Sequence, residues 1–303
     1  MIQIKTVTDL KEAESLWQTL SPRQTIFDDW RFRLTFFKFF PLPILFLAAY
    51  DNKELIGLLP LQKHPKHGYE FFDEYHCEYN HPFVKPGRDD IIPELFGAIP
   101  GPSKIYDLSG RDPFTSSLEL EDYSYFLPLK EIGSFEDFLE QRLSAKRRRS
   151  LAKEIKVVSE SNPELEFFTA SDNKKAAELL EKLFSFNVSN FKDDSYLLEE
   201  ERAGWHELLK QDFDFRLAVV KIKAEIQAIS LSIVYNNDWH YLITGVNFAN
   251  FPGLGKYLVR VNLEEAIKEK NNIFDAGLGD CGWKHLWHFD KEPQYIYTQD
   301  KQG

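Results

Sequence analysis

The sequence is short of cysteine. Its 303 residues include only Cys77 and Cys281, which lie far apart and form no C-x-x-C pair. Two distant cysteines do not build a disulfide framework, so we expect a reduced, cytoplasmic protein.

Long apolar runs are also missing. The most lipid-like stretch, residues 34–50, is interrupted by Lys38, Pro41 and Pro43 and is too short to span a bilayer. Residues 1–16 are charged and lack the apolar core of a signal peptide. We therefore expect no membrane span, and a buried helix end, turn and core strand over residues 34–50.

Basic side chains are outnumbered. The chain has 37 Lys and Arg against 48 Asp and Glu, a formal charge of −11, which makes nucleic acid an unfavourable partner for the whole protein. Residues 142–156 are the exception, because their basic side chains accompany one acidic residue, Glu154. The segment fits either a solvated linker helix or a contact with a phosphate-bearing acceptor or an acidic carrier protein.

The two halves of the sequence predict the same order of strands and helices. Periodicity in the second half predicts strands and helices in the order β-α-α-β-β-β-α-β-α-β. The predicted elements are 165–170, 171–186, 195–211, 215–223, 226–235, 239–247, 255–271, 273–279, 282–289 and 294–299. The same order returns in residues 3–130, including three consecutive strands at 44–51, 54–64 and 69–80. The length and this repeat predict two domains.

The segment NFPGLG (250–255) precedes the predicted helix 255–271. A helix N-terminus presents unpaired N–H groups, and glycine lets an anion approach the backbone closely. The alternative is an ordinary glycine turn. The fingerprints G-x-G-x-x-G and G-K-[ST] are absent, which argues against a Rossmann loop and a P-loop.

The element order resembles that of GNAT N-acetyltransferases, in which a [QR]-x-x-G-x-[GA] segment cradles the coenzyme A pyrophosphate. Asn250 stands here in place of the usual Gln or Arg. The ending also resembles the CelD/BioF2-like acyltransferases, with Trp283 in place of a tyrosine. The matching residues are Pro252, Gly253, Phe274, Asp275, Gly279, Asp280, Lys284 and Trp287. The basic segment resembles the helix between the halves of tandem GNAT proteins, which include the FemABX aminoacyltransferases.

This resemblance implies an α/β (α+β) fold of two tandem GNAT-like domains, each a mixed, mostly antiparallel sheet flanked by helices. The implied boundaries are 1–132 for a first domain without a CoA motif, 133–162 for the basic linker helix, and 163–303 for the CoA-binding domain. It also implies acetyl-CoA or another acyl-CoA as co-substrate. The implied CoA-binding residues are Gly245, Val246, Asn247, Asn250, Gly253, Leu254, Gly255 and Lys256.

Acyl transfer to an amine needs a base and an acid. Asp280 and Asp275 are the candidate bases, although Asp280 could instead cap a helix and Asp275 could only accept backbone N–H bonds. With the family's tyrosine replaced, His285 is one candidate for the acid. Lys284, Trp283 and Arg147 are the candidate substrate contacts, with a merely exposed side chain as the alternative for Lys284.

No metal is expected, because the His, Cys and acidic residues of segment 67–81 fit no zinc spacing. Three functions stay open. The first is acyl transfer from acyl-CoA to an amine or hydroxyl of a small-molecule, carbohydrate or peptide acceptor. The second is FemABX-like transfer from aminoacyl-tRNA to a cell-wall precursor, and the third is a non-catalytic GNAT-fold binding protein.

Overall fold

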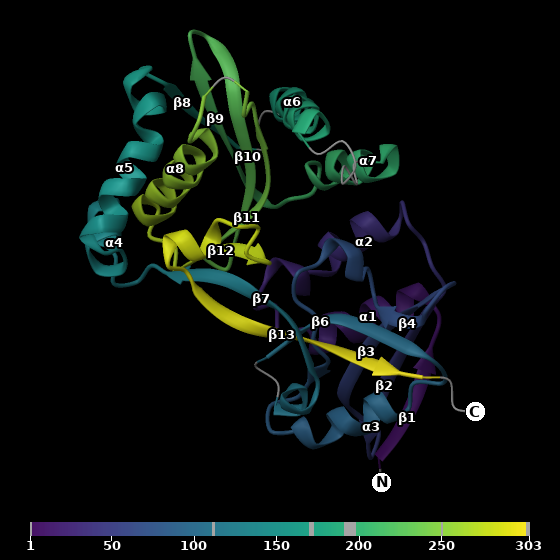
Figure 1. The fold of residues 1–303 in the computed structure, drawn as a ribbon. Helices are drawn as coiled ribbons and strands as arrows, with labels where there is room; N and C mark the ends of the chain where they lie inside the picture. The colour runs from purple at the N-terminus through teal and green to yellow at the C-terminus, as the bar shows by residue number, and fades with distance from the viewer. Residues whose placement is uncertain (1, 111–112, 170–172, 191–197, 250, 301–303) are drawn as a thin grey trace. The chain divides into compact units, whose positions relative to one another are not determined.

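The computed structural model describes residues 2–110, 113–169, 173–190, 198–249 and 251–300. The chain divides into two compact units (Figure 1). Unit 1 comprises Met1–Ser124 and Lys291–Gly303, and unit 2 comprises Tyr125–Asp290.

Unit 1 is a mixed sheet with strand order β1-β2-β3-β4-β6-β13, and β5 pairs with β3. Its strands are β1 Ile2–Val7, β2 Ile44–Asp51, β3 Glu54–His64, β4 Gly68–Phe71, β5 Phe83–Val84, β6 Ser103–Ser109 and β13 Asp290–Gln299. Its helices are α1 Leu10–Leu20, α2 Trp30–Phe37 and α3 Ile92–Gly97, with short 3-10 turns η1 Ile26–Asp28, η2 Glu74–His76, η3 Asp89–Ile91 and η4 Pro113–Ser117. β7 Glu119–Pro128 begins in unit 1 and ends in unit 2.

The core of unit 1 combines aliphatic side chains with a cluster of aromatic rings. α1 begins where Asp9 accepts the N–H of Glu12, and it buries Ala13 and Trp17, which are four residues apart on one face. The Trp17 ring meets Phe83 edge-on at 4.6 Å between centroids. Burial of these apolar side chains stabilises the unit.

Unit 2 has the strand order β7-β12-β11-β10-β9-β8. Besides the end of β7, its strands are β8 Glu164–Phe168, β9 Asp214–Ile222, β10 Glu225–Tyr235, β11 Asp238–Val246 and β12 Ile273–Leu278. Its helices are α4 Phe135–Arg142, α5 Ala145–Glu160, α6 Asn173–Asn190, α7 Glu199–Leu208 and α8 Leu254–Lys268, followed by the 3-10 turn η5 Lys284–Trp287.

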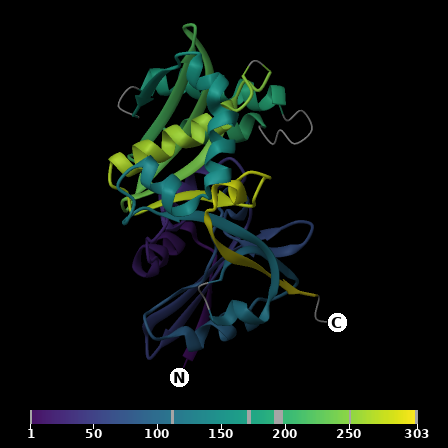
Figure 2. The same cartoon turned by 60° about the vertical axis from the view of Figure 1, so that its left-hand side comes forward.

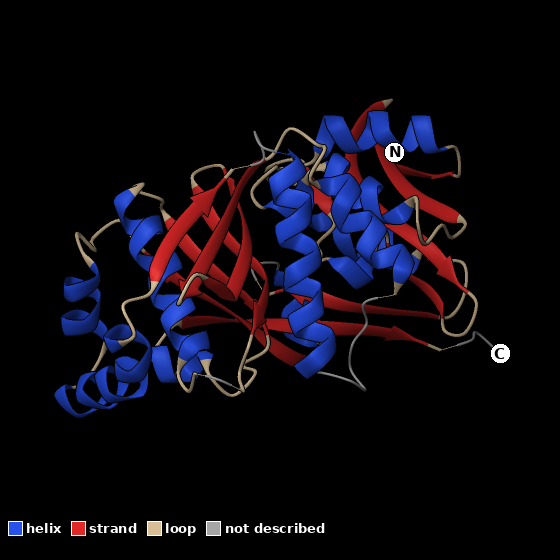
Figure 3. Cartoon of the chain, turned by 90° about the horizontal axis from the view of Figure 1, so that it is seen from above, coloured by secondary structure: helices blue, strands red, loops and turns tan. Residues whose placement is uncertain are grey.

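Helices cover both faces of the unit 2 strands. α5 and α8 pack together on one side of β9–β11, and α6 lies against β10 and β11 on the other side (Figure 1). α8 buries Leu254, Leu258 and Val261, a stripe at helical spacing, and runs alongside the strands (Figure 2). Figure 3 separates the strands, in red, from the flanking helices, in blue.

The two units do not divide the chain into one N-terminal and one C-terminal half. β13 pairs antiparallel with β6, as in the pairs Gln294–Ser109 and Gln299–Ser103, so residues 291–299 group with unit 1. Residues 125–128 of β7 group with unit 2, where β7 neighbours β12. The domain boundaries at 132/133 and 162/163 stay a prediction.

Two predicted elements are corrected. The strand predicted over 69–80 ends at Phe71, because Asp73 takes a left-handed conformation (φ 50°) and the chain turns into η2. The predicted linker helix is two helices, because α4 ends at Arg142 and the Ser144 side chain caps a new helix by accepting the N–H of Arg147. None of the helices in the described part of the chain has the length and apolar character needed to cross a bilayer.

Candidate active site

Strands β11 and β12 diverge after a short stretch of pairing. Their parallel ladder covers three residue pairs, from Asp238–Ile273 to His240–Asp275. From Tyr241 to Val246, β11 continues in pairing with β10 alone. The edge of β11 that faces β12 is therefore open over its second half.

The hydrogen-bond pattern of β11 identifies which backbone groups face that open edge. The N–H of Asn247 donates to the carbonyl of Gln227 at 2.8 Å, so Asn247 points toward β10. Neighbouring residues of an antiparallel strand alternate in direction, so Gly245 also bonds toward β10, whereas Val246 presents its N–H to the open side. Of the predicted CoA-binding residues Gly245, Val246 and Asn247, only Val246 directs its backbone N–H toward the open edge.

A pocket of about 300 Å³ lies beside this edge. Its walls come from β11, the start of α8 and the turn after β12. They are formed by Tyr241, Thr244, Val246, Phe248, Gly253, Gly255, Lys256, Leu258, Val259, Trp283 and Trp287. The predicted loop residues Gly253, Gly255 and Lys256 and the predicted contact Trp283 are thus brought together around one cavity.

Close packing against α5 explains why a glycine, Gly253, stands at the start of α8. Gly253 is the N-cap of α8 with φ +85°, and a Cβ there would lie 1.9 Å from the carbonyl oxygen of Glu154 in α5. Only glycine allows both this conformation and this approach. Leu254 is buried in the first turn of α8, and Asn250 lies outside the described residues.

A second glycine fixes the end of β11. A Cβ on Gly245 would lie 2.4 Å from the carbonyl oxygen of Leu183, so this position lets α6 pack directly on the strand. The Asn190 side chain of the same helix donates to the Val246 carbonyl at 2.6 Å. α6 therefore holds the strand end that carries the open Val246 N–H.

An internal anion sits at the start of α8. The carboxylate of Glu154 accepts hydrogen bonds from Arg147 at 2.7 Å and Ser150 at 2.7 Å, and pairs with Lys256 at 2.7 Å. Partial burial by itself would raise the pKa of Glu154, but these three partners lower it to about 2. Arg147 also donates to the carbonyl of Leu286, so this predicted substrate contact ties α5 to the turn η5.

Asp280 and His285 form a pair in the turn after β12. The Asp280 carboxylate accepts the His285 backbone N–H at 2.7 Å and contacts its Nδ1 at 2.5 Å. Although burial opposes it, the His285 backbone and imidazole lower the pKa of Asp280. A carboxylate with a lowered pKa is a weak base, and its two contacts with His285 fix the orientation of the imidazole.

Asp275 belongs to a second Asp–His pair, which is buried. Its Oδ2 contacts Nδ1 of His240 at 3.0 Å, and its Oδ1 accepts the N–H of Gly277 at 2.9 Å. These bonds hold the end of β12. Asp275, Asp280 and His285 do not line the described pocket, and the His285 side chain is more than half exposed in the turn that carries Trp283.

Lys284 is buried, and the alternative of an exposed lysine is wrong. Its Nζ donates to the carbonyls of Gly277 at 2.9 Å and Leu278 at 2.7 Å. The ammonium thereby fixes the chain where β12 ends and leads to Trp283 and Trp287 at the pocket.

Sequence reasoning did not include Glu154, His240 or Tyr241 in the site. The single acid within the basic segment was a usable signal for Glu154, because a lone carboxylate among cations forms ion pairs. His240 and Tyr241 carry no local signal. His240 meets Asp275 only through the pairing of β11 with β12, and Tyr241 reaches the pocket because β11 continues beyond that pairing.

An open strand edge beside a helix start is the arrangement expected of the GNAT class of α/β proteins. Residues 145–285 match the family model described as the acetyltransferase (GNAT) domain. No curated protein matches the chain.

Three solved structures are similar over nearly the whole chain. The C-terminal domain of a putative lysylphosphatidylglycerol synthetase from Agrobacterium fabrum has a TM-score of 0.59 at 13% identity, covering 96% of this chain and 92% of that one. FemX has a TM-score of 0.59 at 10% identity, with 98% of both chains covered. A tandem GNAT protein from the clavulanic acid biosynthesis pathway has a TM-score of 0.55 at 10% identity, again with 98% of both covered.

These likenesses confirm the predicted fold. The chain has a tandem GNAT-like acyltransferase fold, built from mixed sheets flanked by helices, as the resemblance to tandem GNAT and FemABX proteins implied.

Proposed function

We propose that the chain transfers an acyl group from acyl-CoA to an amine or hydroxyl acceptor, with the donor bound in unit 2. The observation that carries this proposal is the pocket between the open edge of β11 and the first turn of α8. Its size suits an extended arm of a ligand rather than a whole nucleotide.

The residues around the pocket fit an acyl-CoA donor. The open Val246 N–H can bond an extended chain as a neighbouring strand would. The first turn of α8, with Gly255 and Lys256 at the pocket wall, offers N–H groups and a cation to a phosphate. The thioester supplies the activated acyl group, which an amine can attack directly, so no covalent enzyme intermediate is needed.

We assign proton transfer to His285. Asp280 holds its Nδ1, which leaves Nε2 as the atom that takes the proton of the acceptor amine. Val246 is the proposed donor to the thioester carbonyl oxygen, and Trp283 and Trp287 line the cavity and exclude water. Asp275 and Lys284 are proposed to position this turn.

One observation favours a second candidate, aminoacyl transfer from aminoacyl-tRNA as implied by the FemABX resemblance. Glu154 already forms ion pairs with Lys256, in the first turn of α8, and with Arg147 of α5. A site that binds pyrophosphate would have to compete with this carboxylate or share its partners. FemX is also among the structurally similar proteins.

Isothermal titration calorimetry with acetyl-CoA tests the leading proposal. Gly255 is the informative position, because an added Cβ would only touch Phe248 at 3.5 Å, whereas a side chain on Gly253 would collide with α5. We expect Gly255→Glu to weaken acetyl-CoA binding at least about tenfold by placing a carboxylate at the helix N-terminus. Gly255→Ala is the matched control and should bind like the wild type.

Failure to bind acetyl-CoA or longer acyl-CoA would exclude the leading proposal. A salt-sensitive complex with tRNA, weakened in a Lys146→Gln, Lys153→Gln double variant, would then favour the second candidate. Both lysines are exposed on α5, so their loss leaves the Glu154 network intact. Acyl-CoA binding without turnover on a panel of amines would instead favour a non-catalytic binding protein.

A further inference from the structure

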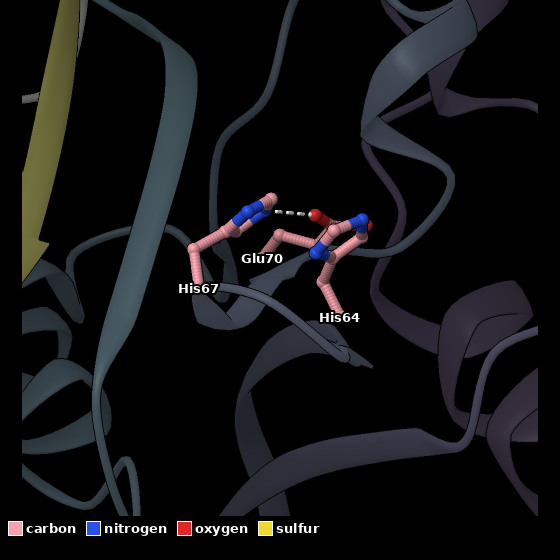
Figure 4. Close-up of side chains that lie close together, drawn as sticks. All are labelled: His64, His67 and Glu70. Atoms are coloured by element: carbon pink, nitrogen blue, oxygen red, sulfur yellow. Dashed lines mark hydrogen bonds and ion pairs between the residues drawn. The ribbon is translucent and has the colours of Figure 1, made fainter.

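Three potential metal ligands converge at the β3–β4 hairpin of unit 1. His64 ends β3, His67 lies in the turn and Glu70 lies in β4, a spacing of H-x2-H-x2-E (Figure 4). One ligand atom from each residue lies within 4.8 Å of the other two. No other group of three His, Cys, Asp or Glu side chains in the described residues meets this condition.

The carboxylate of Glu70 is held in a defined orientation. Its Oε1 accepts a hydrogen bond from Nε2 of Gln62 at 2.7 Å, and the Gln62 Oε1 accepts the N–H of Asp73 at 3.1 Å. Because the amide uses its oxygen for Asp73, it must present its NH₂ to Glu70. The second oxygen, Oε2, is thereby turned toward His67, as an outer hydrogen bond orients a metal-ligating carboxylate.

The two imidazoles lie next to this oxygen. Their rings stack with centroids 3.8 Å apart and planes 14° from parallel, and Nε2 of His67 lies 2.7 Å from Oε2 of Glu70. A cation bound between them would be attracted to a nitrogen of each ring and to the carboxylate. The N–H of Lys66 contacts Nδ1 of His64 at 3.2 Å, and water can replace that contact in the exposed turn.

We propose that His64, His67 and Glu70 bind a divalent transition-metal ion of the Zn²⁺ type. Two imidazoles and one carboxylate suit Zn²⁺ and its neighbours Co²⁺, Ni²⁺ and Cu²⁺, whereas Mg²⁺ and Ca²⁺ prefer oxygen ligands alone. His64 and His67 are only partly buried, so water completes the coordination. The site is separate from the pocket of unit 2 and does not depend on the function proposed there.

The sequence predicts no metal site within residues 67–81, because their spacings match neither C-x2-C nor H-E-x-x-H. His64 lies before this segment. On a hairpin, residues of facing strands meet across the ladder, and His64 is opposite Gly68 in the register of β3 with β4. The side chains of the H-x2-H-x2-E segment therefore meet because the chain turns between β3 and β4, and not because they share one face of a helix.

Zn²⁺ titration by calorimetry of the full chain, stripped with a chelator and exchanged into chelator-free buffer, tests the proposal. We expect saturable binding of one Zn²⁺ per chain, with no binding of Mg²⁺ at the same concentrations. His64→Ala and His67→Ala should each raise the Kd at least about tenfold, since even outer-shell changes cost 10–100-fold. His206→Ala is the matched control, because His206 also contacts a carboxylate, Glu181 at 2.6 Å, without a third ligand.

Two readouts keep the test independent of variant folding. Each variant's metal-free melting temperature serves as its own reference, and Zn²⁺ should raise the melting temperature of only the wild type and the control. Co²⁺ bound to the wild type should show the visible absorption bands of a low-coordinate nitrogen–oxygen site. Absence of saturable Zn²⁺ binding, or wild-type affinity in both histidine variants, would overturn the proposal.

Discussion

Each unit contains three consecutive antiparallel strands, a meander formed by β2–β4 in unit 1 and by β9–β11 in unit 2. A pocket lies beside the helix that follows each meander, and the two pockets differ in the residues that line them. In unit 1 a pocket of about 290 Å³ is bordered by Asp89 of η3 and Ile92, the first residue of α3. In unit 2 the pocket of about 300 Å³ is bordered by Gly255 and Lys256 at the start of α8.

The two pockets differ in the charge at the helix start. α3 has six residues, carries Glu94 in its first turn and follows Asp89 and Asp90 of η3, and this acidic start disfavours an anionic ligand. α8 has fifteen residues, no acidic side chain in its first turn, and a lysine there. The two pockets are alike in size and differ in the side chains at the helix start, where Lys256 of α8 is paired with Glu154 of α5. This difference supports our proposal of a donor site in unit 2.

The meanders also end differently. β4 has four residues where β11 has nine. In unit 1 the guanidinium of buried Arg33 donates to the carbonyls of Phe27 at 2.6 Å, Phe72 at 2.7 Å and Tyr79 at 2.9 Å, which closes the segment after β4. In unit 2 the corresponding strand end stays open.

The largest effect on stability is expected from removing that closure. Arg33→Ala would remove the hydrogen bonds that the guanidinium donates to three carbonyls, and we expect a loss of about 3–5 kcal/mol in the free energy of unfolding. Arg31→Ala, which removes an exposed ion pair with Asp29, is the control and should cost less than about 1 kcal/mol. Urea unfolding measures both, and equal losses would show that Arg33 does not close unit 1.

For the open end in unit 2, we expect His285→Ala to lower kcat about a hundredfold or more, because the proposed base is lost. Release of free CoA with an accepted amine measures the rate, and acetyl-CoA affinity should be unchanged. His206→Ala is again the control. A wild-type rate and pH profile in His285→Ala would remove His285 from the chemistry.

A smaller effect is expected from Lys284→Met, which deprives the carbonyls of Gly277 and Leu278 of their donor. Stability should fall by about 1–3 kcal/mol, as for unsatisfied buried groups. The matched Lys268→Met variant, at an exposed pair with Glu265, should change by less than about 1 kcal/mol. Unchanged stability together with a raised KM would support the substrate contact that the sequence predicted for Lys284.

The smallest effect on stability is expected from the Glu154 carboxylate, which lies beside the start of α8. The folded pKa of Glu154 is about 2, below its usual 4.5, so its ion pairs stabilise the fold above pH 4.5 and this contribution is lost as the pH falls toward 2. We expect Glu154→Gln to be about 1 kcal/mol less stable than the wild type at pH 7 and equally stable near pH 2. A constant difference across this range would contradict the assigned ion pairs.

Much of the fold follows from local sequence patterns. The predicted strands 44–51 and 54–64 coincide with β2 and β3, because alternating and continuous apolar runs are bounded by turn residues. The partner of β13 could not be predicted, since nothing in a strand's own pattern says that residues 294–299 pair with β6. The break at Ser144 was visible as a capping residue, but the basic run around it favoured a single helix.

The candidate site could be predicted only where its residues follow local sequence patterns. The glycine segment and the turn after β12 carry local signals, and the structure places both at one pocket. The direction of the Val246 N–H depends on pairing with β10, and the ion pairs of Glu154 depend on the packing of α5 against α8. Such three-dimensional relations are not readable from residue spacing.

Hydrogen–deuterium exchange with and without acetyl-CoA tests the difference between the two pockets most directly. We predict slower exchange in residues 241–249 and 251–259 of unit 2, and no change in residues 79–84 and 89–92 of unit 1. Protection confined to the unit 1 segments, or equal protection in both units, would contradict the assignment of the donor site to unit 2.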